Sequence, residues 1–189
     1  LLACSANLNG YASEAVLTEL TQSPPANDYA VSKLAMEYMA NLWSGRLPLV
    51  IARPFNYTGV GQSDNFLLPK IVSHLSRKAE KIELGNLDVW RDFSDVRALV
   101  QAYRGLIEVC PVGKTFNVCS GHTHSLREVL AMCSDISGHQ LQVEINPAFV
   151  RAGEVKTLCG SAEVLRSVMP QWQTPPLFET LRWMLESGR

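Results

Sequence analysis

The chain has 189 residues, of which 47% are apolar and 19% are charged. This composition excludes intrinsic disorder, and the length is sufficient for one sizeable core with a second small lobe. The formal net charge is −1. A charge so close to zero argues against non-specific binding of nucleic acid by the whole surface, so any anion-binding site must be local.

The cysteine and histidine content argues against a metal centre. The five cysteines are an odd set without a C-x-x-C pair, so they indicate neither a zinc site nor a disulfide framework. His122 and His124 are two residues apart, which is wrong for one helix face. No stretch reaches the roughly 18 consecutive apolar residues of a membrane span, and no signal peptide is recognisable. We therefore expect no metal and a reduced, cytoplasmic setting.

The first four residues have the pattern of a buried parallel strand that no turn precedes. The sequence contains no G-x-G-x-x-G or related glycine loop, the element that holds a dinucleotide pyrophosphate at a helix N-terminus. These two observations together predict that the sequence begins inside a domain.

A helix of roughly 15 residues is predicted to start just before Tyr29, after the turn-rich segment 23–28. Apolar residues then recur at helical spacing, namely Leu34, Met36, Met39, Leu42 and Trp43. Of these, Met36, Met39 and Trp43 are expected to pack in a core or lobe. Tyr29 and Lys33 are four residues apart, so they lie on one face of this helix. A cation beside a phenol favours the ionised phenol, which makes a tyrosine usable as an acid near neutral pH.

The remaining predicted elements alternate between strands and helices. Strands are predicted at 47–52, 115–119 and 141–145, and two extended pieces surround a Gly-Asn turn within 82–93. Helices are predicted at 66–79, 95–108, 161–169 and 174–187, and a capping box at 125–128 starts a further helix that ends at 138. Residues 56–62 are predicted to be a polar loop at the carboxyl edge of a parallel sheet. The alternation predicts an α/β fold with a small mixed lobe.

The order of these motifs resembles the extended short-chain dehydrogenase/reductase family of nucleotide-sugar enzymes. Three stretches carry the resemblance: Tyr29-Ala30-Val31-Ser32-Lys33, Arg53-Pro54-Phe55-Asn56, and Ser5 placed five residues before Gly10. Gly10 stands where the family closes a V-Y-G triplet, but Asn9 replaces its tyrosine. The resemblance covers nearly the whole chain but only the second half of the family's usual length.

The resemblance implies a fold and a division into two parts. The fold is the C-terminal half of a Rossmann-like parallel sheet, formed by residues 1–56 and about 93–120, with the Tyr/Lys helix. Residues 57–92 and 121–189 are expected to form a nucleotide-sugar-binding lobe of mixed α/β structure. The resemblance also implies a homodimer that pairs the helix bearing Tyr29.

The same resemblance implies catalytic and cofactor residues. Ser5, Tyr29 and Lys33 fall where the family has its catalytic hydroxyl, phenol and amine. NAD(P)H is the implied cofactor, contacted by Tyr29, Lys33, Pro54 and Asn56. No metal is implied.

Two further runs resemble the branch of the family that acts on GDP-sugars. They are G-N-L-D-x-x-R-D-F at 85–93 and R-P-F-N-x-x-G-x-G-Q at 53–62. In that branch an asparagine and two arginines contact the nucleotide-sugar, which by position implies Asn56, Arg91 and Arg151. Glu154 falls where an acidic residue meets the base or ribose, although Ala152 replaces the proline that usually follows the second arginine.

The branch contains both dehydratases and 4-keto reductases. A dehydratase requires a carboxyl just after the catalytic hydroxyl, to manage proton transfer during water loss, and Ala6 and Asn7 supply none. The sequence therefore favours an enzyme that reduces the 4-keto group of a GDP-4-keto-6-deoxy-hexose. A GDP-mannose 4,6-dehydratase, a nucleotide-sugar epimerase and a nucleotide-sugar-binding fragment without redox chemistry are the alternatives.

Overall fold

The computed structural model describes residues 1–6, 16–22, 24–150 and 155–187. The strands are β1 (Leu2–Ala3), β2 (Ile51–Pro54), β3 (Asn56–Thr58), β4 (Lys81–Leu84), β5 (Trp90–Asp95), β6 (Thr115–Val118), β7 (Thr123–Ser125), β8 (Gln142–Ile145) and β9 (Thr157–Leu158). The helices are α1 (Asp28–Trp43), α2 (Leu67–Ser76), α3 (Val96–Val109), α4 (Leu126–Ser137), α5 (Glu163–Val168) and α6 (Leu177–Ser187), with the 3-10 helix η2 (Pro147–Phe149). The α/β class predicted from the sequence is confirmed.

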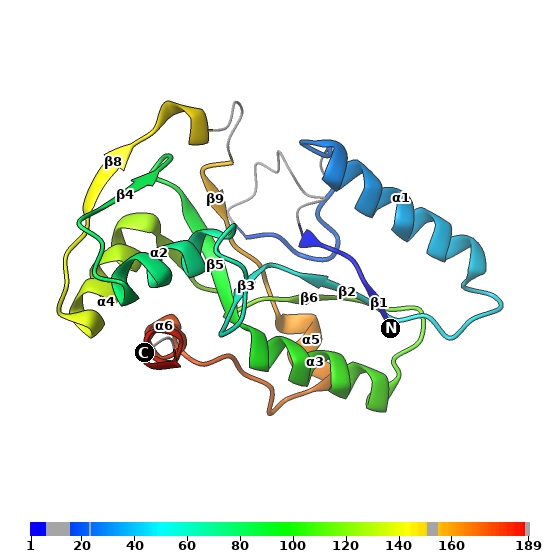
Figure 1. Ribbon diagram of the computed structural model, residues 1–189. Helices are drawn as coiled ribbons and strands as arrows, with labels where there is room; N and C mark the ends of the chain where they lie inside the picture. Colours follow the sequence, from blue (N-terminus) through cyan, green and yellow to red (C-terminus); the bar gives the residue numbers. More distant parts are fainter. Residues whose placement is uncertain (7–15, 23, 151–154, 188–189) are drawn as a thin grey trace.

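One parallel sheet has the strand order β1-β2-β6. In Figure 1, α1 lies on one side of this sheet, and α3 and α5 lie on the other. A core of buried apolar side chains lies on the face of the sheet that α3 and α5 cover. Its larger members include Leu99, Leu106, Phe116, Leu165 and Trp172. Because β1 and β2 are parallel, the α1 crossover begins at the carboxyl edge of the sheet and returns the chain to the opposite edge.

A second group of strands surrounds β5. Strand β3 pairs with β5 in parallel, β7 pairs with it antiparallel, and β9 pairs with it in parallel. A separate parallel pair, β4 and β8, lies beside α2 and α4 at the left of Figure 1. Helices α2, α4 and α6 pack on one another around a second apolar core, whose fully buried members include Leu68, Ile71, Ile82, Val129 and Leu181.

Side-chain caps explain where several helices begin. The Asn27 side chain accepts a hydrogen bond from the Ala30 N–H at 2.9 Å and caps α1. The predicted capping box of α4 is confirmed, because Ser125 and Glu128 each accept a hydrogen bond from the other's backbone N–H. These contacts satisfy N–H groups that have no partner within the helix.

Two local predictions were wrong. Residues 56–58 form a strand rather than a loop, because Asn56 to Thr58 pair in register with Phe93 to Asp95. The strand predicted at 47–52 begins only at Ile51 and continues through Pro54, because its parallel partners are Thr115 to Val118. In both cases the backbone partner lies far along the chain, where a local pattern carries no information.

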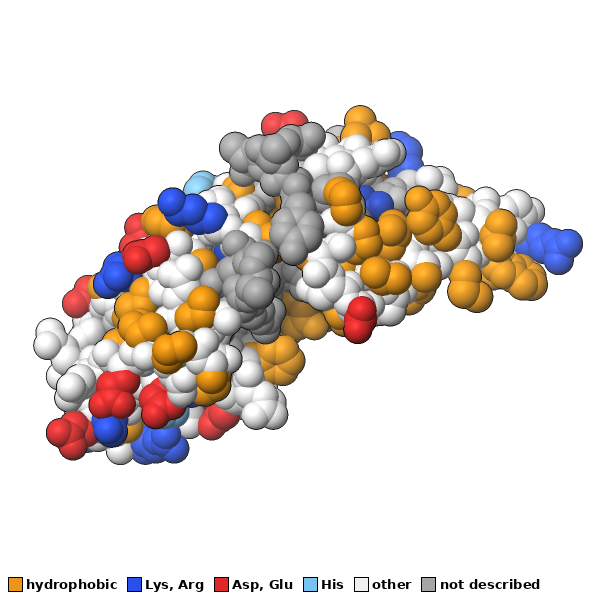
Figure 2. Space-filling view, turned by 90° about the horizontal axis from the view of Figure 1, so that it is seen from above, with side chains coloured by type: hydrophobic (Ala, Val, Ile, Leu, Met, Phe, Trp, Pro, Cys, Tyr) orange, Lys and Arg blue, Asp and Glu red, His pale blue; other side chains and the backbone are white. Residues whose placement is uncertain are grey.

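Two of the three α1 residues expected in a core, Met39 and Trp43, are exposed instead, while Met36 packs against the buried pair Cys4 and Ile51. Leu42 is 84% exposed, Met39 is 64% exposed and Trp43 is 49% exposed. Figure 2 shows hydrophobic side chains gathered on the part of the surface that α1 forms. Among the helices of the described ranges, none combines the length and the apolar character that crossing a membrane requires.

Candidate active site

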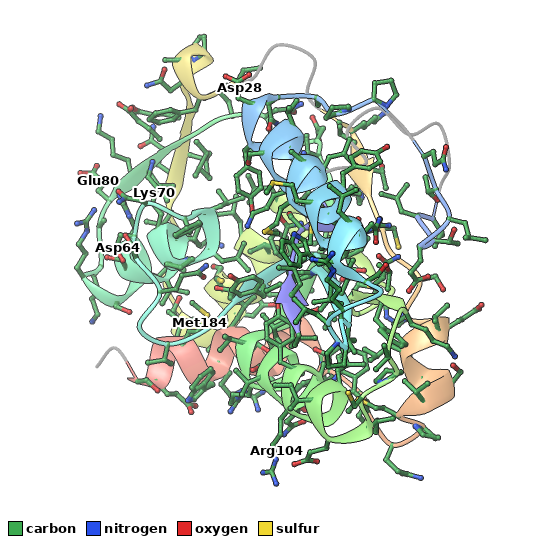
Figure 3. All side chains as sticks on the ribbon, turned by 90° about the vertical axis from the view of Figure 1, so that its right-hand side faces the viewer. Asp28, Asp64, Lys70, Glu80, Arg104 and Met184 are labelled. Carbon is green, nitrogen blue, oxygen red and sulfur yellow. The ribbon has the colours of Figure 1, made fainter. Side chains whose placement is uncertain are left out.

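The N-terminal turns of α1 bring together Tyr29 and Lys33, two of the three predicted catalytic residues. Figure 3 shows α1 descending from Asp28, which directly precedes Tyr29. The Lys33 ammonium lies 5.6 Å from the centroid of the Tyr29 ring, within the range of a cation–π contact. The Tyr29 side chain is not sealed in packing, because the residue is 51% exposed. The phenol is therefore accessible to a ligand and has a cation beside it.

Ser5 lies where β1 ends, at the same edge of the sheet. It is buried, with 6% of its surface exposed. Its neighbour Cys4 donates a thiol hydrogen bond to the Lys33 carbonyl oxygen at 3.4 Å, so the end of β1 runs beside the second turn of α1. Burial raises the pKa of the Cys4 thiol to about 12, so it is protonated and able to donate at neutral pH.

Pro54 and Asn56 lie at and beyond the end of β2, the strand next to β1. Pro54 is buried and Asn56 is partly buried. The carboxyl ends of neighbouring parallel strands meet at one edge of a sheet, where open α/β folds bind their ligands. The fold therefore places Ser5, Tyr29 and Asn56 at a common edge.

Arg91 lies in β5, the strand that pairs with β3 and hence with Asn56. The Arg91 guanidinium donates to the Trp90 carbonyl oxygen at 2.9 Å and to the Lys156 carbonyl oxygen at 3.3 Å. The Asn56 side-chain amide donates to the Asp92 carbonyl oxygen at 3.3 Å. The backbone pairing thus brings two of the predicted substrate residues onto adjacent strands.

Asp92, next to Arg91, is a buried carboxylate that the sequence reasoning did not single out. Its oxygens accept hydrogen bonds from the Ser120 N–H at 2.8 Å, the Ser120 hydroxyl at 2.6 Å and the Gly121 N–H at 2.9 Å. Burial raises the pKa of Asp92, while these hydrogen bonds and one from Gly160 act in the opposite direction. The carboxylate joins β5 to the connection between β6 and β7, so it fixes the strand that carries Arg91.

Two predicted substrate residues, Arg151 and Glu154, lie outside the described residues. Within the described ranges, no group of three or more His, Cys, Asp or Glu side chains is arranged to hold a metal ion. A cavity of about 550 Å³ opens beside the later turns of α1 rather than at its start; it is lined by Glu19, Leu20, Thr21, Gln22, Pro24, Leu34, Glu37, Tyr38, Asn41 and Arg53.

The arrangement suits proton transfer to a ligand oxygen. A half-exposed phenol can donate a proton, and an adjacent ammonium can offset the negative charge that remains. The Ser5 hydroxyl lies at the same edge of the sheet, and its hydrogen bond to the ligand oxygen stays a prediction. The residues present fit the nicotinamide-ribose end of a dinucleotide, since Tyr29 and Lys33 offer two donors on one accessible face. The individual roles of Ser5, Tyr29, Lys33, Pro54 and Asn56 stay predictions.

Comparison with known proteins identifies relatives over nearly the whole chain. The family model described as GDP-mannose 4,6 dehydratase matches residues 1–182. GDP-6-deoxy-D-talose 4-dehydrogenase of Aggregatibacter actinomycetemcomitans is 34% identical over 165 residues, covering 87% of this chain and 56% of that protein. GDP-6-deoxy-D-mannose reductase of Pseudomonas aeruginosa is 36% identical over 144 residues, covering 72% of this chain and 47% of that protein. The chain therefore spans about half the length of these relatives.

Solved structures agree. A Burkholderia cenocepacia protein described as a candidate epimerase is 60% identical, with a TM-score of 0.96, and covers 100% of this chain and 62% of that one. The structure of RMD from Pseudomonas aeruginosa complexed with NADPH is 31% identical, with a TM-score of 0.90, and the match covers 98% of this chain and 65% of that one. The fold, the motif order and these matches agree, so the resemblance is confirmed: the chain belongs to the GDP-mannose 4,6-dehydratase family within the extended short-chain dehydrogenases/reductases.

Proposed function

We propose that the protein to which this chain belongs reduces the 4-keto group of a GDP-4-keto-6-deoxy-hexose with NAD(P)H. The observation that carries the proposal is the exposed Tyr29 side chain with the Lys33 ammonium 5.6 Å from its ring centroid, at the sheet edge where Ser5 follows β1. Two relatives support the substrate class, since their names specify a GDP-6-deoxy-sugar 4-dehydrogenase and a GDP-6-deoxy-sugar reductase.

In the proposed reaction, bound NAD(P)H supplies the hydride that adds to C4. Tyr29 gives a proton to the oxygen on C4 as negative charge develops there. Lys33 attracts the negative charge left on the phenol oxygen and hydrogen-bonds a ribose hydroxyl. Ser5 donates a hydrogen bond to the C4 oxygen, which strengthens as charge builds on that oxygen.

The substrate residues act away from the reacting carbon. Asn56, Arg91 and Arg151 anchor the GDP diphosphate, because arginine offers paired, charge-assisted hydrogen bonds to phosphate oxygens. Glu154 binds the base or ribose, and Pro54 lines the cofactor side of the crevice. Binding energy gained at the diphosphate thereby orients the sugar relative to Tyr29.

The decisive experiment replaces Tyr29 with phenylalanine in a form of the protein that spans the full length of its relatives. We expect kcat for the keto-sugar to fall by about 10² or more, because proton transfer by a positioned group contributes at least that factor. Tyr38→Phe is the matched control, since Tyr38 is 65% exposed on the same helix and should leave kcat unchanged. Turnover of Tyr29→Phe within about tenfold of the parent contradicts the proposal.

A second candidate function is nucleotide-sugar binding without redox chemistry. Calorimetric titration of the 189-residue chain with GDP and with NADPH separates the two functions. Heat of binding with GDP but not with NADPH favours this second function, and heat of binding with both favours the oxidoreductase.

Three related assignments belong to the same proposal. The first is a division into a Rossmann-like part, residues 1–56 and about 93–120, and a nucleotide-sugar lobe, residues 57–92 and 121–189; the presence of two apolar cores supports two packing units, although Leu165 and Trp172 of the second range pack in the core of the sheet. The exposed apolar face of α1 supports a homodimer. The third assignment is a cytoplasmic location, supported by an odd set of five cysteines without a C-x-x-C pair, which suits a reducing setting. A dehydratase or epimerase reaction at the same site is distinguished by assaying water loss and C4 inversion beside reduction.

A further inference from the structure

We infer that Arg53 is a positioning residue for the proposed reaction. Its guanidinium fastens α1, β2 and the segment 17–19 to one another, and thereby holds Tyr29 and Lys33 at the carboxyl edge of the sheet. The inference rests on the proposed function, because it concerns the placement of the proposed acid.

Arg53 has hydrogen-bond partners on all three guanidinium nitrogens. Its Nε donates to Glu37 Oε1 at 2.8 Å and its Nη2 donates to Glu37 Oε2 at 2.6 Å. The third nitrogen, Nη1, donates to the Glu19 carbonyl oxygen at 3.0 Å. The paired contact with Glu37 restrains orientation as well as distance, which a lysine ammonium at the same place could not do.

Glu37 transmits this restraint to the proposed acid. Tyr29, Lys33 and Glu37 are successively four residues apart, so they follow one another along one face of α1. Holding Glu37 against β2 therefore sets both the rotation of α1 about its axis and its position along that axis. The thiol of Cys4, bonded to the Lys33 carbonyl oxygen, adds a second link between the sheet and the same face.

The second partner residue of Arg53, Glu19, belongs to the segment that leads into α1. The Glu19 carboxylate accepts a hydrogen bond from the Asn117 N–H at 2.7 Å, and the Asn117 side chain donates to the Leu17 carbonyl oxygen at 3.1 Å. Segment 17–19 is thus attached to β6 as well as to Arg53. The guanidinium lies where the sheet, the helix and this segment meet.

Orientation, rather than stability alone, is the role that this geometry supports. The Arg53 and Glu37 side chains are only 12% and 7% exposed, and a buried ion pair gains little net stability because desolvation opposes the Coulomb attraction. A matched comparison is the Arg104–Glu108 pair of α3, with an N–O distance of 2.7 Å but side chains 79% and 59% exposed. Figure 3 shows Arg104 extending away from the protein, remote from α1.

The first test is Arg53→Lys in a form that spans the length of the relatives, with Arg104→Lys as the control. We expect kcat to fall about 10- to 100-fold in Arg53→Lys, because a displacement of about 1 Å at a reacting group costs about that factor. The KM for the nucleotide-sugar should change by less than about threefold, which marks a loss confined to the transition state. Arg104→Lys should match the parent in both constants. Parent-level kcat in Arg53→Lys overturns the inference.

The second test separates positioning from stability. The double variant Arg53→Met with Glu37→Met replaces the ion pair by apolar side chains of similar length, a change that buried pairs often tolerate without loss of stability. A double variant with the parent melting temperature but a low kcat supports positioning. A double variant with the parent kcat overturns it. If the double variant has a lower melting temperature than the parent, the kcat of Arg53→Lys decides whether Arg53 is a positioning residue.

Failure of the inference and failure of the proposed function give different results. When Tyr29→Phe is inactive and Arg53→Lys is fully active, only the positioning role falls. When Tyr29→Phe retains turnover, the proposed function falls whatever Arg53→Lys does. Hydrogen exchange on the 189-residue chain gives a readout that does not need activity. The amides of α1 should exchange faster in Arg53→Lys and not in Arg104→Lys, and unchanged exchange contradicts the anchoring of α1.

Discussion

At the residue scale, Asp95 shows how one carboxylate can connect two helices. As the N-cap of α3 it accepts a hydrogen bond from the Arg97 N–H at 2.7 Å, and it also pairs with the Arg97 guanidinium at 2.6 Å. The Thr180 hydroxyl of α6 donates to it at 2.8 Å. Burial pushes the pKa of Asp95 upward, but the hydrogen bonds from Arg97 and Thr180 outweigh it, so the pKa lies below the ordinary value.

We therefore predict that Asp95→Asn destabilises the chain in a pH-dependent way. At pH 7 the free energy of unfolding should fall by about 1–2 kcal/mol, the usual cost of weakening a charged helix cap. A lowered folded-state pKa stabilises the fold above the unfolded-state value of 3.8, and this contribution is lost as the pH falls through the folded-state pKa. Urea unfolding at several pH values should show the difference between parent and variant shrinking at acid pH.

The control for this experiment is Asp135→Asn, which changes an exposed carboxyl of α4. It should leave the free energy of unfolding within about 0.5 kcal/mol at every pH, as is usual for surface substitutions. An Asp95→Asn deficit that stays constant from pH 7 down to acid pH contradicts a role for the charge.

At the element scale, α3 and α4 end in the same backbone conformation with different residues. The C-cap residue of α4 is Gly138, with φ of 67°, and that of α3 is Cys110, with φ of 47°. The left-handed region favours glycine, because a Cβ atom there approaches the following carbonyl oxygen. Helix α3 therefore ends with a strained residue and α4 does not.

Cys110→Gly should therefore raise the free energy of unfolding by about 0.5–1 kcal/mol. The substitution relieves the left-handed strain, and part of that gain is offset because glycine adds conformational entropy to the unfolded chain. The mirror control is Gly138→Ala, which should lower it by about 1 kcal/mol. Both are measured by urea unfolding. A loss of stability in Cys110→Gly would show that the thiol makes a favourable contact that outweighs the strain.

At the scale of the whole molecule, α1 presents one face to the sheet and an apolar face to solvent. The exposed residues on it include Val31, Tyr38, Met39, Leu42 and Trp43. A contiguous apolar patch on a folded chain marks a surface that another polypeptide covers. This exposed face is the physical basis of the proposed homodimer, whose contact would then lie on the helix that carries Tyr29.

Leu42→Glu should weaken that association, because it buries an unpaired carboxylate in an apolar contact. We expect sedimentation velocity at micromolar concentration to show a dimer for the parent chain and at least a tenfold weaker association for the variant, about 1.4 kcal/mol or more. Ile107→Glu is the matched control, since Ile107 is 61% exposed on α3 on the opposite side of the sheet. Equal effects of the two substitutions would place the contact elsewhere.

The sequence by itself determined the local features of this protein and its family. The contact between Tyr29 and Lys33 follows from a spacing of four on a helix, and the cap of α4 follows from the spacing of Ser125 and Glu128. Both depend on residues within one or two turns. Helical periodicity and capping patterns carry this short-range information directly.

Only the tertiary structure decided which distant residues meet. Glu37 and Arg53 are 16 residues apart, and the donors to Asp92 come from 28, 29 and 68 residues away. The apolar residues of α1 had the period of a core helix, yet several face solvent, because periodicity identifies an apolar face without saying what covers it. Long-range partners depend on how the packed elements fit together, and that information is spread over the whole chain rather than held in any one segment.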